Sequence, residues 1–126
     1  MTLQEQVGQL FILGFDGTGV IQPLRRFLRE FRPGGMILFA RNLDSPVQVA
    51  HLTNDLQAAV PDGPLLMAID QEGGRVSRLP AGFTVFPASG VLGQGDASEL
   101  AYAAAAATAA ELRAVGINLN TAPVLD

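Results

Sequence analysis

Residues 65–76 read LLMAIDQEGGRV, an apolar run that ends abruptly in charged residues and glycines. The run from Leu65 to Ile69 is too short for a helix and carries no polar side chain, which is typical of a strand buried on both faces. Asp70 follows it directly, although a carboxylate is costly to desolvate at the tip of a buried strand. The stretch therefore predicts a buried parallel strand with a functional carboxylate at its carboxyl end.

Three more apolar runs of this kind predict strands, and apolar residues at helical spacing predict helices between them. A short leading helix is also expected, because Thr2 and Glu5 have the spacing of a capping box. The other strands are expected at Gln9–Phe15, Met36–Ala40 and Ile117–Val124. The helices are expected from Gly19 to Phe31, from the cap Ser45 to Pro61, and from the cap Asp96 to Gly116.

Strands that alternate with helices indicate an α/β fold with a parallel sheet. Two architectures fit: a small doubly wound sheet, or the first half of a (β/α)₈ TIM-type barrel with about four parallel strands. The 126 residues are short for a complete barrel, which typically needs roughly 250. A long irregular loop is expected from Gln71 to Gly95, and the alanine run from Ala103 to Ala107 predicts a helix that lies close to the sheet.

The composition excludes several classes of function. The net charge is −4, and the eight basic residues are all Arg, four of them on one expected helix (Arg25, Arg26, Arg29 and Arg32). Nucleic-acid binding would need a basic balance and a wider stripe, so we expect no nucleic-acid partner. The chain has no Cys, and no apolar run is long enough for a membrane span. The opening lacks a secretory pattern, so a cytoplasmic protein without a membrane partner is expected.

In both architectures a ligand site lies at the carboxyl ends of the strands. Those ends carry Asp16, Arg41-Asn42, Asp70-Gln71-Glu72 and Asp126. Asp16 could instead form a turn with Gly17, and Arg41 could simply pair with a neighbouring carboxylate.

The richest segment runs from Asp70 to Val76 and holds two carboxylates, one Arg and two glycines. Carboxylates accept hydrogen bonds from sugar hydroxyls, and a planar guanidinium brackets such groups. The single His, His51, falls in mid-helix, and no His and carboxylate cluster has the spacing of a metal site. We therefore expect no metal and no cofactor.

Residues 70–76 resemble the signature of glycoside hydrolase family 3, in its bacterial β-N-acetylhexosaminidase branch. Residues 5–11 resemble the opening of that family, residues 33–42 its second strand, and residues 122–126 the end of its fourth strand. The resemblance covers essentially the whole chain, in order and at plausible spacing. It implies that residues 1–126 form the N-terminal half of a catalytic (β/α)₈ barrel.

The resemblance also implies an activity, the removal of terminal β-linked N-acetylglucosamine by a retaining mechanism, with cell-wall fragments under cytoplasmic recycling as substrates. Asp70 would grip hydroxyls of the terminal sugar, Arg75 and Glu72 would shape the loop beside it, and Asp126 would support the site. The family's nucleophile, an Asp, and its His and Asp acid/base group match positions beyond Asp126. No catalytic residue is therefore expected within this chain.

Two other readings stay open. One is a non-catalytic half-barrel that binds carbohydrate, or that associates with itself or a partner through the exposed edges of its first and fourth strands. The other is an unrelated small α/β domain that binds a phosphorylated ligand through Asp16 to Gly19, because this glycine-rich segment lies between a strand and a helix.

Overall fold

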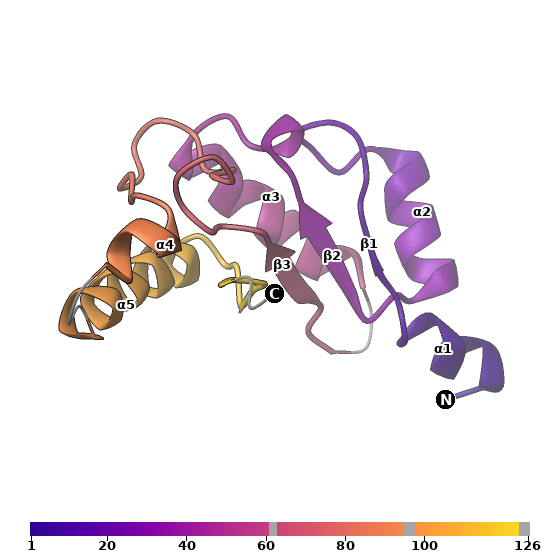
Figure 1. The fold of residues 1–126 in the computed structure, drawn as a ribbon. Coiled ribbons are helices and arrows are strands. Elements are labelled where there is room, and N and C mark those ends of the chain that lie inside the picture. Colours follow the sequence, from indigo (N-terminus) through magenta and orange to yellow (C-terminus); the bar gives the residue numbers. More distant parts are fainter. Residues whose placement is uncertain (61–62, 95–97, 124–126) are drawn as a thin grey trace.

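The computed structural model of the protein describes residues 1–60, 63–94 and 98–123, in which helices alternate with the strands of one parallel sheet (Figure 1). The helices are α1 (Leu3–Gly8), α2 (Gln22–Phe31), the 3-10 turn η1 (Ala40–Asn42), α3 (Pro46–Ala59), α4 (Ser89–Leu92) and α5 (Ser98–Ala114). The strands are β1 (Ile12–Leu13), β2 (Gly35–Leu38), β3 (Leu66–Ile69) and β4 (Leu119–Asn120).

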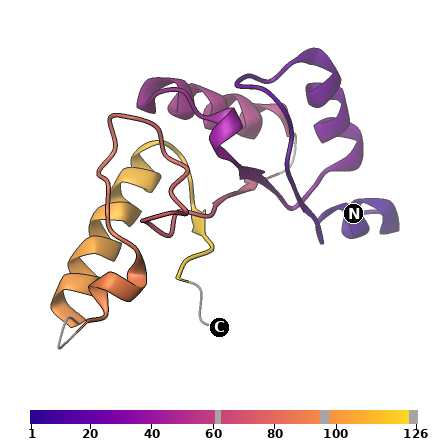
Figure 2. The same cartoon turned by 45° about the horizontal axis from the view of Figure 1, so that its top comes forward.

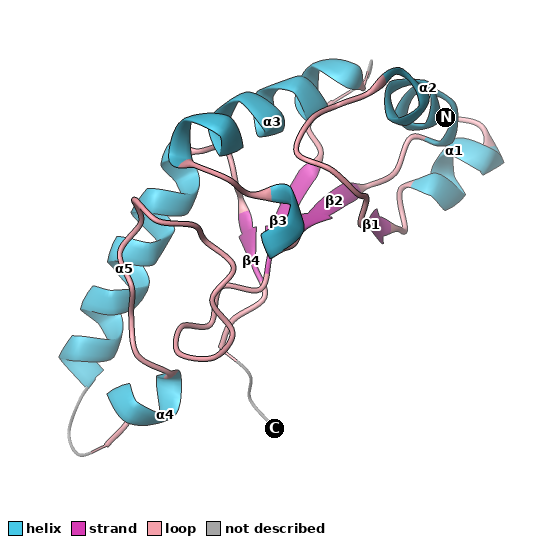
Figure 3. Ribbon diagram, turned by 90° about the horizontal axis from the view of Figure 1, so that it is seen from above, coloured by secondary structure: helices cyan, strands magenta, loops and turns pink. Residues whose placement is uncertain are grey.

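The strand order decides between the two architectures. The strands lie in the order β1-β2-β3-β4, and every neighbouring pair is parallel. Figure 3, viewed from above, shows α2, α3 and α5 in an outer arc around the strands. A doubly wound sheet reverses its order at a switch point and carries helices on both faces, whereas a barrel keeps sequential order with its helices outside. The fold is therefore the first half of a (β/α)₈ barrel.

The core lies between the sheet and its helices, and it fixes where the strands end. Its buried side chains come from β2, β3, the helices and the segment before β4: Leu28, Met36, Leu38, Val49, Leu52, Leu56, Met67, Ile69, Leu112 and Ile117. The buried hydroxyl of Thr53 on α3 donates to the Val115 carbonyl at 2.7 Å, which ties α3 to the entrance of β4. The parallel pairing of Ile69 with Asn120 then brings the carboxyl ends of β3 and β4 side by side.

Local sequence signals placed several elements correctly. Thr2 and Glu5 form the predicted capping box of α1, with Thr2 N donating to Glu5 Oε2 at 2.8 Å. Ser45 caps α3 and Pro46 is its first residue, as expected. Gly116 ends α5 with a φ of +80°, a conformation that favours glycine. The predicted cap Asp96 lies outside the described residues.

The first strand departs from the prediction of a buried run over Gln9–Phe15. β1 spans only two residues, and Leu10 is 82% exposed while Phe11 and Ile12 are also exposed. A strand is buried on both faces only where neighbours cover it, and within the described chain β1 pairs with β2 alone. β1 is thus an open edge.

The alanine run of α5 was also interpreted wrongly. Of residues 103–107 only Ala104 is buried, and Figure 2 shows α5 extending away from the sheet. Small side chains permit close approach but supply little apolar area to drive it. Only the end of the helix joins the core, through Leu112. The loop expected from Gln71 to Gly95 is irregular over its described residues, 71–94, apart from the single helical turn of α4.

Candidate functional site

Asp70 stands at the carboxyl end of β3 with 28% of its side chain exposed. The hydroxyl of Thr121, just past β4, donates to Asp70 Oδ1 at 2.5 Å. Arg78 Nη2 lies 3.7 Å from the other carboxylate oxygen, Oδ2. The predicted carboxylate is therefore held between the next strand and a guanidinium, while part of it stays open to a ligand.

Arg78 reaches Asp70 because the chain reverses at two glycines. Gly73 and Gly74 have φ values of +85° and +59°, and Gly73 forms an isolated antiparallel bridge with Val76. A Cβ at Gly73 would lie 2.5 Å from the Pro87 carbonyl oxygen, and one at Gly74 would lie 2.7 Å from Ala88 Cβ. Both the backbone conformation and the lack of space therefore require glycine, and the turn folds the following residues back over β3.

The guanidinium of Arg78 has an unused donor. Its Nε is buried and has no hydrogen-bond partner among the described residues, although the side chain as a whole is 32% exposed. A buried donor without an acceptor is unfavourable, and an oxygen atom of a ligand would satisfy it. Asp70 and Arg78 together thus offer an acceptor and donors at one point of the strand end.

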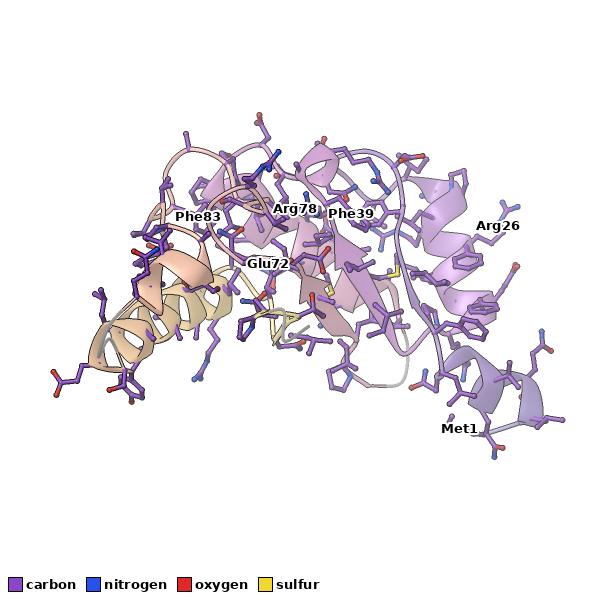
Figure 4. The ribbon with its side chains drawn as sticks, viewed as in Figure 1. Met1, Arg26, Phe39, Glu72, Arg78 and Phe83 are labelled. Carbon is purple, nitrogen blue, oxygen red and sulfur yellow. The ribbon has the colours of Figure 1, made fainter. Side chains whose placement is uncertain are left out.

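The other two predicted binding residues lie on either side of the glycine turn. Glu72 is half-buried, follows β3 in the same loop as Arg78 (Figure 4), and lines an apolar cavity of about 380 Å³ together with Phe86, Leu92 and α5. Arg75 is exposed and makes no hydrogen bond or ion pair with any described residue. The structure thus brings Arg78, which the sequence analysis did not single out, beside Asp70 and leaves Arg75 at the outside of the turn.

The polar residues that follow β1 and β2 form a separate cluster, and they bind one another and the backbone. Arg41 Nε lies 2.8 Å from Asp16 Oδ1, and its guanidinium stacks 4.6 Å from the centre of the Phe39 ring. Asn42 is fully buried and donates to the carbonyls of Phe15 and Gly17 at 3.1 and 2.8 Å. The alternative reading of Arg41, a pair with a neighbouring carboxylate, is therefore confirmed.

Neither a phosphate loop nor a metal site is favoured by the geometry. Helix α2 begins at Gln22 rather than directly after Gly19, and the exposed carboxylate of Asp16 lies in the loop between β1 and α2. His51 is exposed on α3. No described part of the chain gathers three His, Cys, Asp or Glu side chains that could hold a metal ion.

Within residues 1–60, 63–94 and 98–123, no helix has the length and apolar character to cross a membrane. Asp126 lies outside the described residues.

Solved structures resemble this fold closely. A glycoside hydrolase family 3 beta-N-acetylglucosaminidase from Paenibacillus sp. str. FPU-7 matches with a TM-score of 0.93 and 47% identity, over 98% of this chain and 24% of that one. NagZ from Neisseria gonorrhoeae in complex with N-trifluoroacetyl-D-glucosamine matches with a TM-score of 0.81 and 37% identity, over 91% of this chain and 36% of that one.

Sequence comparison agrees with the structural one. A beta-hexosaminidase of Pseudomonas aeruginosa is 44% identical over 116 residues, which are 91% of this chain and 34% of that protein. The chain thus spans about a third of the length of the curated relatives it matches. The profile of the glycosyl hydrolase family 3 N-terminal domain matches residues 2–126. By this match over nearly its whole length, the chain belongs to glycosyl hydrolase family 3.

Proposed function

We propose that this chain supplies part of the sugar-binding site of a β-N-acetylhexosaminidase, an enzyme that cleaves terminal β-linked N-acetylglucosamine. The observation that carries the proposal is the Asp70 carboxylate with Arg78 Nη2 3.7 Å away, at the carboxyl end of a central barrel strand. Barrel enzymes of this type bind their substrates at that end. The proposal also draws on the relatives, whose printed names are beta-hexosaminidase and beta-N-acetylglucosaminidase.

The chemistry of the pair suits a sugar. The carboxylate oxygens accept hydrogen bonds from two adjacent hydroxyls, and the buried Nε of Arg78 needs an acceptor such as a hydroxyl oxygen. The role proposed for both residues is binding and orientation, away from the reacting carbon. Glu72 and Arg75 remain proposed as residues that shape the loop.

The proposed reaction is a double displacement that retains the anomeric configuration. An aspartate attacks the anomeric carbon while an acid group protonates the leaving oxygen, and water then hydrolyses the glycosyl-enzyme. Both groups are proposed to come from segments that follow Asp126, and none is assigned within the chain. The proposed substrates are cell-wall fragments that are recycled in the cytoplasm. This part of the proposal rests on the family resemblance alone, and fractionation of cells would test the cytoplasmic location.

Two measurements test this function. An enzyme that includes this chain should hydrolyse aryl N-acetyl-β-glucosaminides, and NMR of the first product should show the β-anomer. Initial formation of the α-anomer would contradict the retaining mechanism. Titration of the enzyme with N-acetylglucosamine should show weaker binding after Asp70→Ala, and unchanged affinity and turnover would remove the role of Asp70.

A second candidate function is self-association without catalysis. It is favoured by one observation, the apolar edge around β1 in which Leu10 and Phe11 are exposed. Unpaired strands with apolar side chains invite association. Sedimentation of the chain at several concentrations tests this candidate, with Leu10→Lys as the disrupting variant. A chain that stays monomeric throughout would eliminate it.

A further inference from the structure

Gln71 is a buried polar residue at the centre of the candidate site, and both ends of its side-chain amide form hydrogen bonds. It is only 5% exposed. Its Oε1 accepts hydrogen bonds from the backbone N–H groups of Arg78 at 2.8 Å and Leu79 at 3.3 Å. Its Nε2 donates to Ser77 Oγ at 3.0 Å. One side chain therefore holds the segment that returns after the glycine turn.

The backbone of Gln71 is held in turn by the neighbouring strand. Its N–H donates to Asn120 Oδ1 at 3.0 Å, and Asn120 Nδ2 donates to its carbonyl oxygen at 3.1 Å. Asn120 is the last residue of β4, so this two-point contact joins the ends of β3 and β4. Gln71 thus links β4, β3 and the segment 77–79 in one continuous network.

We propose that Gln71 and Asn120 are positioning residues that set the separation between the Asp70 carboxylate and the Arg78 guanidinium. The inference rests on the proposed sugar-binding function and deepens it. Asp70 immediately precedes Gln71 in the chain, while Arg78 is bonded to Gln71 through its own backbone N–H. The backbone of Arg78 is therefore held next to Asp70 by the amide side chain of Gln71, the residue that follows Asp70.

The other contacts of the loop do not replace this link. The nearest are the hydrogen bond of Glu72 N to the Val76 carbonyl oxygen at 3.0 Å, the bridge of Gly73 with Val76, and the hydrogen bond of Gly74 N to the Phe86 carbonyl oxygen at 2.9 Å. These contacts fix the glycine turn, whereas the Gln71 amide holds the backbone of residues 77–79 to the end of β3. A displacement of about 1 Å at a binding group is enough to cost roughly a hundredfold in catalysis. Loss of the Gln71 amide should therefore weaken sugar binding while the barrel remains folded.

The test compares three variants in the protein, with two readouts. Gln71→Leu removes the amide at similar volume, and Gln71→Glu keeps an acceptor for the N–H groups of Arg78 and Leu79. Gln57→Leu is the matched control, because Gln57 clamps both the N–H and the carbonyl of Leu65, at 2.9 and 3.0 Å, at the opposite end of β3. The readouts are hydrogen exchange at the Arg78 and Leu79 amides, and the dissociation constant of N-acetylglucosamine from NMR titration.

We expect Gln71→Leu to accelerate exchange at both amides at least tenfold and to weaken sugar binding at least tenfold. Gln71→Glu should restore most of the protection and affinity, and Gln57→Leu should leave both readouts within twofold of wild type. If Gln71→Leu does not fold, Asn120→Asp, which keeps one of the two Asn120 bonds, should weaken binding by roughly three- to tenfold.

Two results would overturn the positioning role: unchanged exchange at Arg78 and Leu79 in Gln71→Leu, or a loss of affinity in Gln57→Leu equal to that in Gln71→Leu. In Asn120→Asp, unchanged exchange and affinity would have the same meaning. A wild-type protein that binds no N-acetylglucosamine would instead remove the proposed function. The exchange measurement would still decide whether Gln71 positions Arg78, so the two failures are distinguishable.

Discussion

The hydroxyl of Thr121 lies 2.5 Å from Oδ1 of Asp70 and 3.2 Å from the carbonyl oxygen of Ile69. A hydroxyl has one proton, and the shorter distance together with the negative charge directs it to the carboxylate. The ends of two consecutive strands therefore meet at a single carboxylate. Its orientation depends on β4 as much as on β3.

Thr121→Val should weaken N-acetylglucosamine binding about tenfold. The variant loses the hydrogen bond that orients Asp70. Hydrogen bonds to charged groups contribute about 1.5–3 kcal/mol, and we expect the lower end of this range because the site is partly exposed. Calorimetric or NMR titration measures the change. Thr121→Ser keeps the hydroxyl and should retain most of the affinity. Equal losses in the two variants would show that packing, rather than the hydrogen bond, matters.

Arg78→Ala should weaken sugar binding more than Arg75→Ala. Arg78 faces Asp70, whereas Arg75 is exposed and contacts no described residue through a hydrogen bond or ion pair. We expect a loss of tenfold or more for Arg78→Ala and a loss below threefold for Arg75→Ala in the same titration. The reverse order would support the role that the sequence alone assigned to Arg75.

Asn42→Ala should lower the free energy of unfolding by about 2–4 kcal/mol, because the Gly17 carbonyl and the N–H of Phe39 lose the Asn42 side chain as their partner and the Phe15 carbonyl loses one of its two donors. Urea denaturation measures this loss. The control is Arg41→Ala, which removes the largely exposed pair with Asp16 and the exposed hydrogen bond to the Phe15 carbonyl, and which should cost under about 1 kcal/mol. A sugar affinity that falls in folded Asn42→Ala would instead place Asn42 in the binding site.

Gly34→Ala should lower the free energy of unfolding by at least about 1–3 kcal/mol. An added Cβ would lie 2.2 Å from the Gln9 carbonyl oxygen, and a backbone atom cannot rotate away. Gly19→Ala is the matched control, since a Cβ there meets nothing within 4 Å. Thermal unfolding of both variants compares them. Similar melting temperatures for Gly34→Ala and wild type would contradict the close approach of α1 to the entrance of β2.

Glu5 should make the stability of the N-terminal helix depend on pH. Its hydrogen bond from the Thr2 backbone, with the charge of Arg32 at 2.8 Å, holds the pKa of Glu5 below its usual value of 4.5. The folded state therefore binds this proton less tightly than the unfolded state. The contribution is present above about pH 4.5 and is lost as the pH falls through the lowered value. The stabilities of wild type and Glu5→Gln, measured by denaturation, should differ at pH 6, and the difference should shrink as the pH falls below 4.5; a constant difference would refute this.

The sequence predicted those features that depend on near neighbours. Ser45 followed by Pro46 placed the start of α3, and the apolar run before Asp70 placed both β3 and the carboxylate at its tip. These signals are local, because a cap or a strand end is determined by a few adjacent residues. The family resemblance rests on the same segment, and the match over residues 2–126 agrees with it.

Features that depend on distant partners were missed. Arg78 joins Asp70 only because the chain turns at Gly73 and Gly74 and because Gln71 holds the returning segment. The two glycines were the available signal, since a reversal there brings later residues back over the strand. The exposure of Leu10 likewise depends on what lies beside β1, which no pattern within residues 9–15 reveals.

The bonds that Asp70 and Gln71 form with Thr121 and Asn120 also set an order of events during synthesis. Their partners lie 51 and 49 residues later in the chain. Translation proceeds at about 5–20 residues per second, so roughly 2–10 seconds separate the two segments as they are made. In that interval Asp70 can take its place at the end of β3, but β4, whose end orients the carboxylate, has not yet been made. On the ribosome, Asp70 and Gln71 therefore reach their final arrangement only after the fourth strand has emerged.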